Sequence, residues 1–221
     1  MPDTPAAVLF DMDGTLVDTE HLWWQAAAEL AAELDLTLTE ADLPEVLGRA
    51  VEHTAAHLHR TSGTGRDEDD LVAALNDSFA GKVAGRAVPR PGALALLAEL
   101  RAAAVPTALV SASPRRVVDL VLSGLGREWF TVTLAAEDTP RTKPEPDPYL
   151  AAADRLGLDP ADCVAVEDTP AGVASASAAG CAVLAVPSTV PITAAGRVTL
   201  LDSLEQADLA LLGRLAAARP A

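Results

Sequence analysis

The sequence predicts an α/β fold, with a parallel sheet covered by helices on both faces and an all-helical segment inserted after the first strand. Helical patterns lie between most of the predicted strands, and this alternation is typical of parallel sheets. Between the first two strands lie about 70 residues without a strand pattern, from Asp18 to Val88. The short apolar runs that predict strands are residues 6–10, 107–110, 131–135, 163–166 and 182–186.

The long segment after the first strand is predicted to be a separate helical domain. Its first helix places Leu22, Trp23, Ala26, Ala27 and Leu30 on one face. Further helical patterns cover residues 40–47, 51–58 and 67–84, and Pro89-Arg90-Pro91-Gly92 then returns the chain to strand–helix alternation. We therefore expect a core domain of residues 1–17 and 89–221 and a helical domain of residues 18–88. Residues 16–19 and 88–92 would be the hinges.

The second half of the chain carries recognisable helix ends. Leucines at helical spacing predict a helix over residues 93–101. Ser113 followed by Pro114 predicts an N-cap with proline at the first position of a helix over residues 115–122. Gly157 would end a helix over 149–156, Thr169-Pro170 would begin one that closes near Gly180, and a last surface helix would follow Asp208.

Composition limits the partners and the compartment. Half of the 221 residues are apolar, so a substantial core can form, and the net charge of −16 makes nucleic acid and anionic membranes poor partners. The two cysteines lie in or beside apolar runs, which favours buried thiols in a reducing compartment. No signal peptide or membrane-spanning run is recognisable. We expect a cytoplasmic protein, monomeric, with a small-molecule substrate.

Polar side chains gather where the predicted strands end. In an open α/β sheet, functional groups collect at the carboxyl ends of the strands, so these side chains are expected to meet in one crevice. The set comprises Asp11 and Asp13 after the first strand, Ser111 after the second, Lys143 in the loop after the third, and Glu167 with Asp168 after the fourth.

Four segments in chain order resemble the motifs of the haloacid dehalogenase superfamily, specifically its β-phosphoglucomutase-like subgroup. They are Asp-Met-Asp-Gly-Thr-Leu at 11–16, Leu-Val-Ser-Ala-Ser at 109–113, Lys-Pro-Glu-Pro-Asp-Pro-Tyr at 143–149 and Val-Glu-Asp-Thr-Pro-Ala-Gly at 166–172. Each motif alone is weak, but four in order at sensible spacing are specific, and the match covers the whole chain. The resemblance implies a Rossmann-like core and makes the helical insert similar to the subgroup's cap domain.

The resemblance also implies roles for individual residues. Asp11 would be the nucleophile that forms an aspartyl phosphate, and Asp13 the general acid and then the general base. Ser111 and the amide of Ala112 would bind the phosphoryl oxygens. Lys143 would neutralise charge on Asp11 and the phosphoryl group. Thr15 is expected to orient Asp13.

A magnesium ion is the implied cofactor, because a carboxylate and a phosphate dianion repel each other unless a cation lies between them. Asp11, the backbone carbonyl of Asp13 and Asp168 would bind Mg²⁺. For Glu167, direct ligation and ligation through water both remain open, as does a purely supporting role.

The helical insert offers fewer functional candidates. Arg49, after Gly48, is a candidate for binding the non-transferring end of the substrate. His53 and His57 are one helical turn apart, but without a third ligand a solvated helix face is the better interpretation. Trp23 and Trp24 are more often core residues of such a domain than pocket lining.

The motifs favour one branch of the family. Dehalogenases lack the second aspartate, here Asp13, and the phosphonate-cleaving branch needs a lysine in the cap, which has only Lys82 near its end. The mutase branch has a histidine where this chain has Trp23. We therefore predict a Mg²⁺-dependent phosphatase of a sugar or polyol phosphate, with a β-phosphoglucomutase-type mutase as the alternative. A phospho-accepting signalling domain is a remote third possibility, since such domains have no helical insert.

Overall fold

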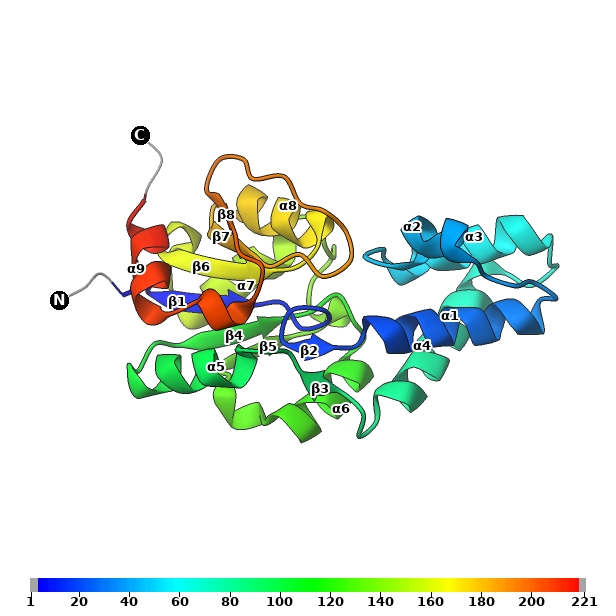
Figure 1. The fold of residues 1–221 in the computed structure, drawn as a ribbon, viewed down its shortest axis with the longest axis horizontal. Helices are drawn as coiled ribbons and strands as arrows, with labels where there is room; N and C mark the ends of the chain where they lie inside the picture. Colours follow the sequence, from blue (N-terminus) through cyan, green and yellow to red (C-terminus); the bar gives the residue numbers. More distant parts are fainter. Residues whose placement is uncertain (1–3, 219–221) are drawn as a thin grey trace.

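A six-stranded parallel sheet forms the centre of the larger lobe, called the core here (Figure 1). The computed structural model describes residues 4–218. The strand order is β5-β4-β1-β6-β7-β8 and all neighbours are parallel, which confirms the predicted fold class. The strands are β1 (Ala7–Phe10), β4 (Thr107–Val110), β5 (Val132–Leu134), β6 (Cys163–Glu167), β7 (Ala182–Ala185) and β8 (Val198–Leu200).

Both faces of the sheet are buried under helices. Val8 and Phe10 of β1 belong to an apolar cluster on one face, while Ala7 and Leu9 belong to a cluster on the other, as the alternation of side chains along a strand requires. Such burial on both sides explains the continuous apolar runs in the sequence. The first face is covered by α5 (Ala93–Ala102), α6 (Arg115–Leu125) and α9 (Leu209–Ala217), and the second by α7 (Asp147–Leu156) and α8 (Pro170–Ala179).

The segment after β1 forms a helical lobe, called the cap here, at the end of the core toward which β1 and β6 point (Figure 1). It has an apolar cluster of its own, which includes Leu30, Leu58 and Leu71. Its helices are α1 (Glu20–Glu33), α2 (Leu43–Val46), α3 (Val51–Ser62) and α4 (Glu68–Val83). Short 3₁₀ helices span Glu40–Asp42 in the cap and Arg127–Trp129, Ala136–Asp138, Pro160–Asp162 and Leu204–Gln206 in the core.

The two predicted hinge segments pair with each other, which the sequence did not indicate. Val17–Asp18 (β2) and Val88–Pro89 (β3) form a two-stranded antiparallel sheet where the chain enters and leaves the cap. The expectation that residues 18–88 hold no strand is therefore wrong at its two ends. Two-residue strands are too short to leave a periodic pattern. The domain boundaries at 17/18 and 88/89 stay a prediction.

The helix ends were predicted with one error. Gly157 and Gly180 end α7 and α8 in the left-handed conformation, and Thr169 caps α8 by accepting the Gly172 N–H. Ser113 does not cap α6, because the residue before that helix is Pro114 and Ser113 has another partner, described below. The edge strand β8 was not predicted, since its three residues are only partly buried. Within residues 4–218 no helix has the length and apolarity that crossing a bilayer requires.

Candidate active site

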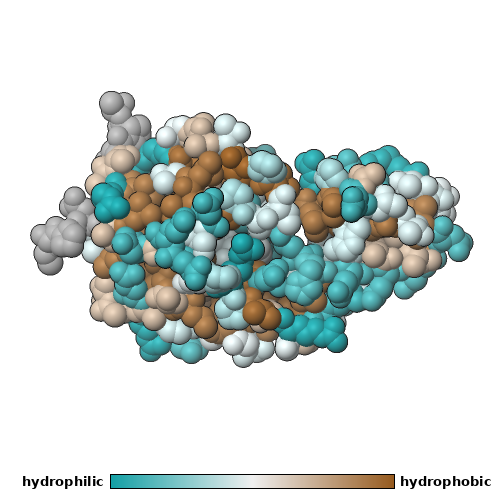
Figure 2. Space-filling view, viewed as in Figure 1, coloured by the Kyte–Doolittle hydropathy of each residue, from teal (hydrophilic) through white to brown (hydrophobic). Residues whose placement is uncertain are grey.

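A cavity of about 160 Å³ lies between the core and the cap, and Figure 2 shows a notch in the surface where the two lobes meet. The core contributes the carboxyl ends of its strands, with Asp11, Asp13, Lys143 and Asp168 in the cavity wall. This position agrees with the rule that ligands bind outside the carboxyl ends of parallel strands. The structure therefore brings together four residues that come from three separate segments of the sequence.

Lys143 is the centre of the polar network under the cavity. Its buried ammonium contacts Asp11 Oδ1 at 2.6 Å, the Val110 carbonyl at 2.8 Å and Glu167 Oε1 at 2.6 Å, so each of its three N–H donors has an acceptor. Burial alone would lower the pKa of Lys143, but the carboxylates of Asp11 and Glu167 outweigh it and raise the pKa. Lys143 is therefore a permanent cation next to Asp11.

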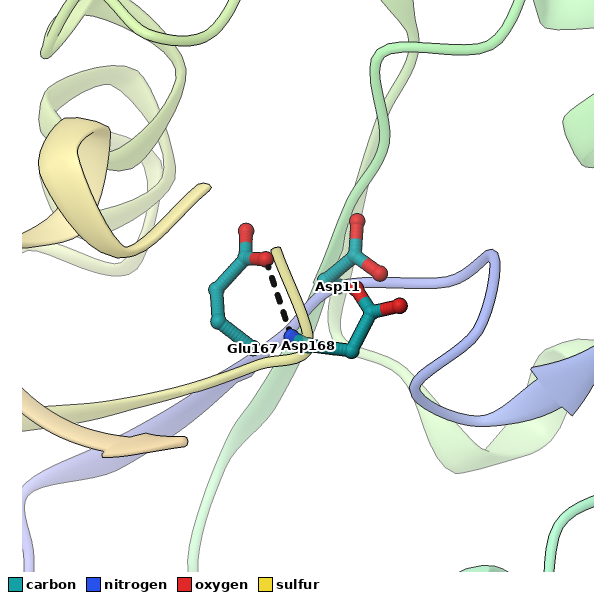
Figure 3. Close-up of side chains that lie close together, drawn as sticks. All are labelled: Asp11, Glu167 and Asp168. Atoms are coloured by element: carbon teal, nitrogen blue, oxygen red, sulfur yellow. Dashed lines mark hydrogen bonds between the residues drawn. The ribbon is translucent and has the colours of Figure 1, made fainter. Parts of the chain in front are cut away.

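Three buried carboxylates offer oxygen atoms within 4.8 Å of one another: Asp11 at the end of β1, and Glu167 and Asp168 at the end of β6 (Figure 3). Asp11 Oδ2 is buried and has no hydrogen-bond partner among residues 4–218. Burial, reinforced by the charges of Asp11 and Glu167, raises the pKa of Asp168 well above its usual value. A cluster of carboxylates that repel one another, one of whose oxygen atoms, Asp11 Oδ2, lacks a partner among residues 4–218, fits a hard divalent cation such as Mg²⁺.

Asp13 lies in a different environment from Asp11, although only Met12 separates them. Its Oδ1 accepts from the Thr19 hydroxyl and its Oδ2 from the Ser113 hydroxyl, both at 2.7 Å. Burial and the neighbouring charge of Asp11 raise the pKa of Asp13 to about 6. The prediction that Thr15 orients Asp13 is wrong, because the Thr15 hydroxyl donates to Asp168 Oδ1 at 3.3 Å.

Glu167 is completely buried behind the cavity wall. It accepts from the Tyr149 hydroxyl at 2.5 Å and contacts Lys143, and burial is the main cause that raises its pKa. Its carboxylate also lies against Gly172 of α8, where a Cβ atom would stand 1.9 Å from Oε2. In the same way a Cβ on Gly14, whose φ is +79°, would stand 2.0 Å from Asp168 Oδ2. Both glycines are required by the carboxylates packed against them.

The predicted phosphoryl-binding residues differ in their access to the cavity. Ala112 lies in the wall together with Ser113 and Pro114, which precede α6. Ser111 is buried beneath this wall, and its hydroxyl accepts the Ser113 N–H at 2.9 Å. The structure thus places the Ala112 segment on the cavity and Ser111 behind it as a support for the turn.

The cap supplies the opposite wall of the cavity. Trp23 stacks edge-on against Phe79 with ring centroids 5.3 Å apart, and both line the cavity, so Trp23 is a core and a pocket residue at once. Arg49 also lines the cavity, with its Nε donating to the Pro44 carbonyl at 2.9 Å. His53 and His57 each face a carboxylate, Glu45 and Asp42. The expected solvated helix face fits His53, whose side chain is 40% exposed, but not His57, whose side chain is only 15% exposed.

Sequence reasoning missed several residues that support the site. Thr19 and Ser113 bind Asp13, Tyr149 binds Glu167, and the Ser188 hydroxyl donates to Asp168 Oδ2 at 2.5 Å. Tyr149 and Ser113 lie inside the motifs quoted above, so the motifs could have identified both as residues of the site. Ser188 follows β7, and nothing in its local sequence indicates that the loop turns back to β6.

Comparison with known proteins agrees with the geometry of the site. Residues 5–180 match the family of haloacid dehalogenase-like hydrolases. The chain is 38% identical to hexitol phosphatase A of Escherichia coli (strain K12), over 90% of this chain and 91% of that protein.

Two solved structures resemble the fold. CbbY from Rhodobacter sphaeroides, in complex with phosphate, has a TM-score of 0.81 at 28% identity, covering 91% of this chain and 96% of its own. A β-phosphoglucomutase from Clostridium difficile has a TM-score of 0.77 at 18% identity, covering 96% and 97%, and shows the shared fold alone.

Proposed function

Because the chain belongs to the haloacid dehalogenase-like hydrolases, we propose that it is a member of their β-phosphoglucomutase-like subgroup and a phosphomonoester hydrolase that works through an aspartyl phosphate on Asp11. It is an enzyme of this hydrolase family, related to phosphatases, as the motifs predicted. To this family assignment the proposal adds a reaction, a substrate class and a role for each site residue. The substrate would be a small phosphorylated polyol or sugar.

The observation that carries the proposal is the difference between the two aspartates. Asp11 is fixed by Lys143, whose ammonium donates to Asp11 Oδ1 at 2.6 Å and holds this carboxylate in place as the proposed nucleophile. Asp13 has a pKa raised to about 6, close to neutrality, which suits a group that gives and later takes a proton. Two neighbouring carboxyl groups with separate environments are what an acid–base and nucleophile pair requires.

Each residue of the site has its own role in the two halves of the proposed reaction. Asp11 attacks phosphorus and Asp13 protonates the leaving alcohol, so the first half of the reaction leaves the phosphoryl group on Asp11. In the second half water attacks the phosphoryl group while Asp13 accepts a proton from that water, and the bond between phosphorus and the Asp11 oxygen breaks to release inorganic phosphate and the free Asp11 carboxylate. Thr19 and Ser113 keep Asp13 in place, Lys143 offsets the charge that develops, and the Ala112 segment binds the phosphoryl oxygens.

A divalent metal ion fits the residues present. Asp11, Asp168 and the backbone carbonyl of Asp13 would hold Mg²⁺, and the partnerless, buried Asp11 Oδ2 supports this. When bound, the ion would supply positive charge beside the phosphoryl oxygens. Glu167 already accepts from Tyr149 and contacts Lys143, so we assign it a supporting position behind the direct ligands.

The substrate class rests on the cap and on the relatives. The cavity is small and has the cap helices as one wall, which suits a small metabolite better than a macromolecule. A relative with 38% identity is a hexitol phosphatase, which supports a polyol phosphate. We further propose that the protein is a cytoplasmic monomer.

The deciding experiment assays phosphate release by purified protein with Mg²⁺ from a panel of sugar and polyol phosphates. An Asp11→Asn variant should lose at least about 1,000-fold in kcat, because the nucleophile is gone. An Asp13→Asn variant should stall both formation and hydrolysis of the phosphoenzyme. Activity of the Asp11→Asn variant near the wild-type value would contradict the mechanism.

The same panel tests the mutase alternative. If no phosphomonoester is hydrolysed but β-glucose 1-phosphate is isomerised in the presence of a bisphosphate activator, the mutase is the correct function. Trp23 in the cavity wall favours the phosphatase, because the mutase branch resembled by the sequence has a histidine at this position.

A further inference from the structure

One polar side chain in the cap wall of the cavity has no partner. Asn76 lies on α4, one helical turn before Phe79, and both line the cavity. Its backbone carbonyl accepts from Arg116, but within residues 4–218 its side-chain amide makes no hydrogen bond. Asn76 is partly buried in the cavity wall, so its amide donor and acceptor are available to a ligand that enters the cavity.

The charges on the cap side of the cavity point to the kind of group that belongs there. Among the described residues, the charged side chains that the cap contributes to the cavity wall are Glu20 and Arg49, one acidic and one basic, so this wall has no net charge. Glu20 Oε1 accepts from the Thr189 hydroxyl at 2.7 Å. A second phosphate or a carboxylate would lie against Glu20 with a single arginine to balance it, whereas hydroxyl groups suit an uncharged wall.

We propose that Asn76 is a specificity-determining residue, whose amide binds a hydroxyl group of an uncharged leaving group while the phosphate lies at Lys143 and the Ala112 segment. The inference rests on the proposed phosphatase and deepens it. The preferred substrate is the monophosphate of a polyhydroxylated molecule, and bisphosphates and plain alkyl phosphates are poor substrates. An amide is well suited to this task, because it can donate to one hydroxyl oxygen and accept from another.

The test compares three probes: a hexitol monophosphate, hexyl phosphate, which has a chain of the same length without hydroxyls, and a hexitol bisphosphate. Wild-type protein should favour the hexitol monophosphate in kcat/KM over both other probes. Asn76→Leu should raise KM for the hexitol monophosphate about 10-fold, which is the loss of one neutral hydrogen bond, and leave kcat within about 2-fold. KM for hexyl phosphate should not rise.

Controls separate specificity from a structural effect. Ser78→Ala on the same helix removes a hydroxyl that contacts Glu29 outside the cavity, and it should leave the preference between the probes unchanged. Asn76→Ala serves as a second variant if Asn76→Leu folds poorly. Thermal unfolding curves of all variants establish that they are folded.

Binding provides a readout that does not depend on turnover. In an Asp11→Asn background, calorimetry should show the hexitol monophosphate binding about 10-fold more weakly once Asn76 is also replaced by leucine. Equal losses for the hexitol monophosphate and hexyl phosphate, or wild-type kcat/KM for the bisphosphate equal to that for the monophosphate, would overturn the inference. If instead no phosphate is released from any probe while binding follows this pattern, the proposed function fails, and only the binding of a hydroxyl group by the Asn76 amide is retained.

Discussion

Gly172 and Glu167 show how closely the site is packed at the scale of single residues. The first turn of α8 lies against the Glu167 carboxylate, and a Cβ on Gly172 would overlap all three atoms of that group. Glu167 in turn contacts Lys143, which contacts Asp11. The absence of a side chain at Gly172 therefore leaves the space that Glu167 needs, and through Glu167 it affects the position of Lys143 beside the proposed nucleophile Asp11.

Gly172→Ala is expected to displace Glu167 and to damage both stability and activity. The overpacking should cost about 1–3 kcal/mol of unfolding free energy, measured by urea denaturation. Misplacement of Lys143 by about 1 Å should lower kcat/KM by about 100-fold.

The matched control is Gly124→Ala in α6, another helical glycine, which has nothing within 4 Å of a built Cβ. It should be neutral or stabilise by up to about 1 kcal/mol, since alanine is the better helix former. Equal effects of the two substitutions would show that the Glu167 contact is unimportant.

At the scale of elements, Arg197 joins three segments at the edge of the core opposite to the cavity. Its guanidinium donates to the carbonyls of Gly180 after α8, Ala161 before β6, and Leu215 and Ala216 near the end of α9. Carbonyls at helix ends have no partner within their helix and carry partial negative charge, so an arginine suits them. This contact fixes α9 and α8 to the amino end of the sheet.

Arg197→Met is expected to lower stability without affecting the proposed chemistry. Loss of a charged donor to four helix-end carbonyls, three of them in partly buried residues, should lower the unfolding free energy by about 1–3 kcal/mol. Because Gly180 and Ala161 precede β7 and β6, they lie at the opposite ends of these strands from Asp168, and KM and kcat at 25 °C should not change.

Arg214→Met on α9 is the control, since Arg214 is exposed and none of its side-chain atoms makes a hydrogen bond or ion pair with the rest of residues 4–218. Its unfolding free energy should stay within about 0.5 kcal/mol of the wild type. A loss as large as that of Arg197→Met would assign the effect to α9 itself rather than to the carbonyl contacts.

At the scale of the whole molecule, the cap is packed against the core and not merely connected to it. Leu22, Phe79 and Val83 of the cap share an apolar cluster with Met12 and Leu16 of the core. Arg116 of α6 also forms an ion pair with Asp77 of α4 at 2.6 Å. The proposed specificity of Asn76 depends on this contact, because α4 carries Asn76 next to the side chains that fix it to the core.

The two thiols report on unfolding of the core. Cys163 and Cys181 are free and buried, and burial raises their pKa to about 11 and about 12. A raised pKa favours the neutral thiol, so at pH 8 only about one part in a thousand or less is thiolate, against roughly a quarter in an unfolded chain.

A thiol reagent such as DTNB should therefore react slowly with native protein and rapidly above the urea midpoint. The reactive fraction should follow the circular dichroism transition through the urea titration. Rapid labelling of native protein at pH 8 would contradict burial of the pair.

The sequence by itself determined the class of fold and most of the chemistry. Buried strands need continuous apolar runs, and helix ends need particular residues such as Thr169 and Gly180. A short stretch of sequence is therefore enough to predict these features. Asp11, Asp13, Lys143, Glu167 and Asp168 follow predicted strands, and the geometry of a parallel sheet brings such residues to one edge.

Only the tertiary structure decided which of these groups touch. Three findings depend on segments that meet in space. Thr19 rather than the expected Thr15 binds Asp13, Ser111 lies behind the cavity wall, and β2 pairs with β3. The Asn76 amide facing the cavity without a partner depends on them too. Hydrogen bonds form between neighbours in space, whose distances the packing of the cap on the core sets, and a local sequence pattern carries no record of that packing.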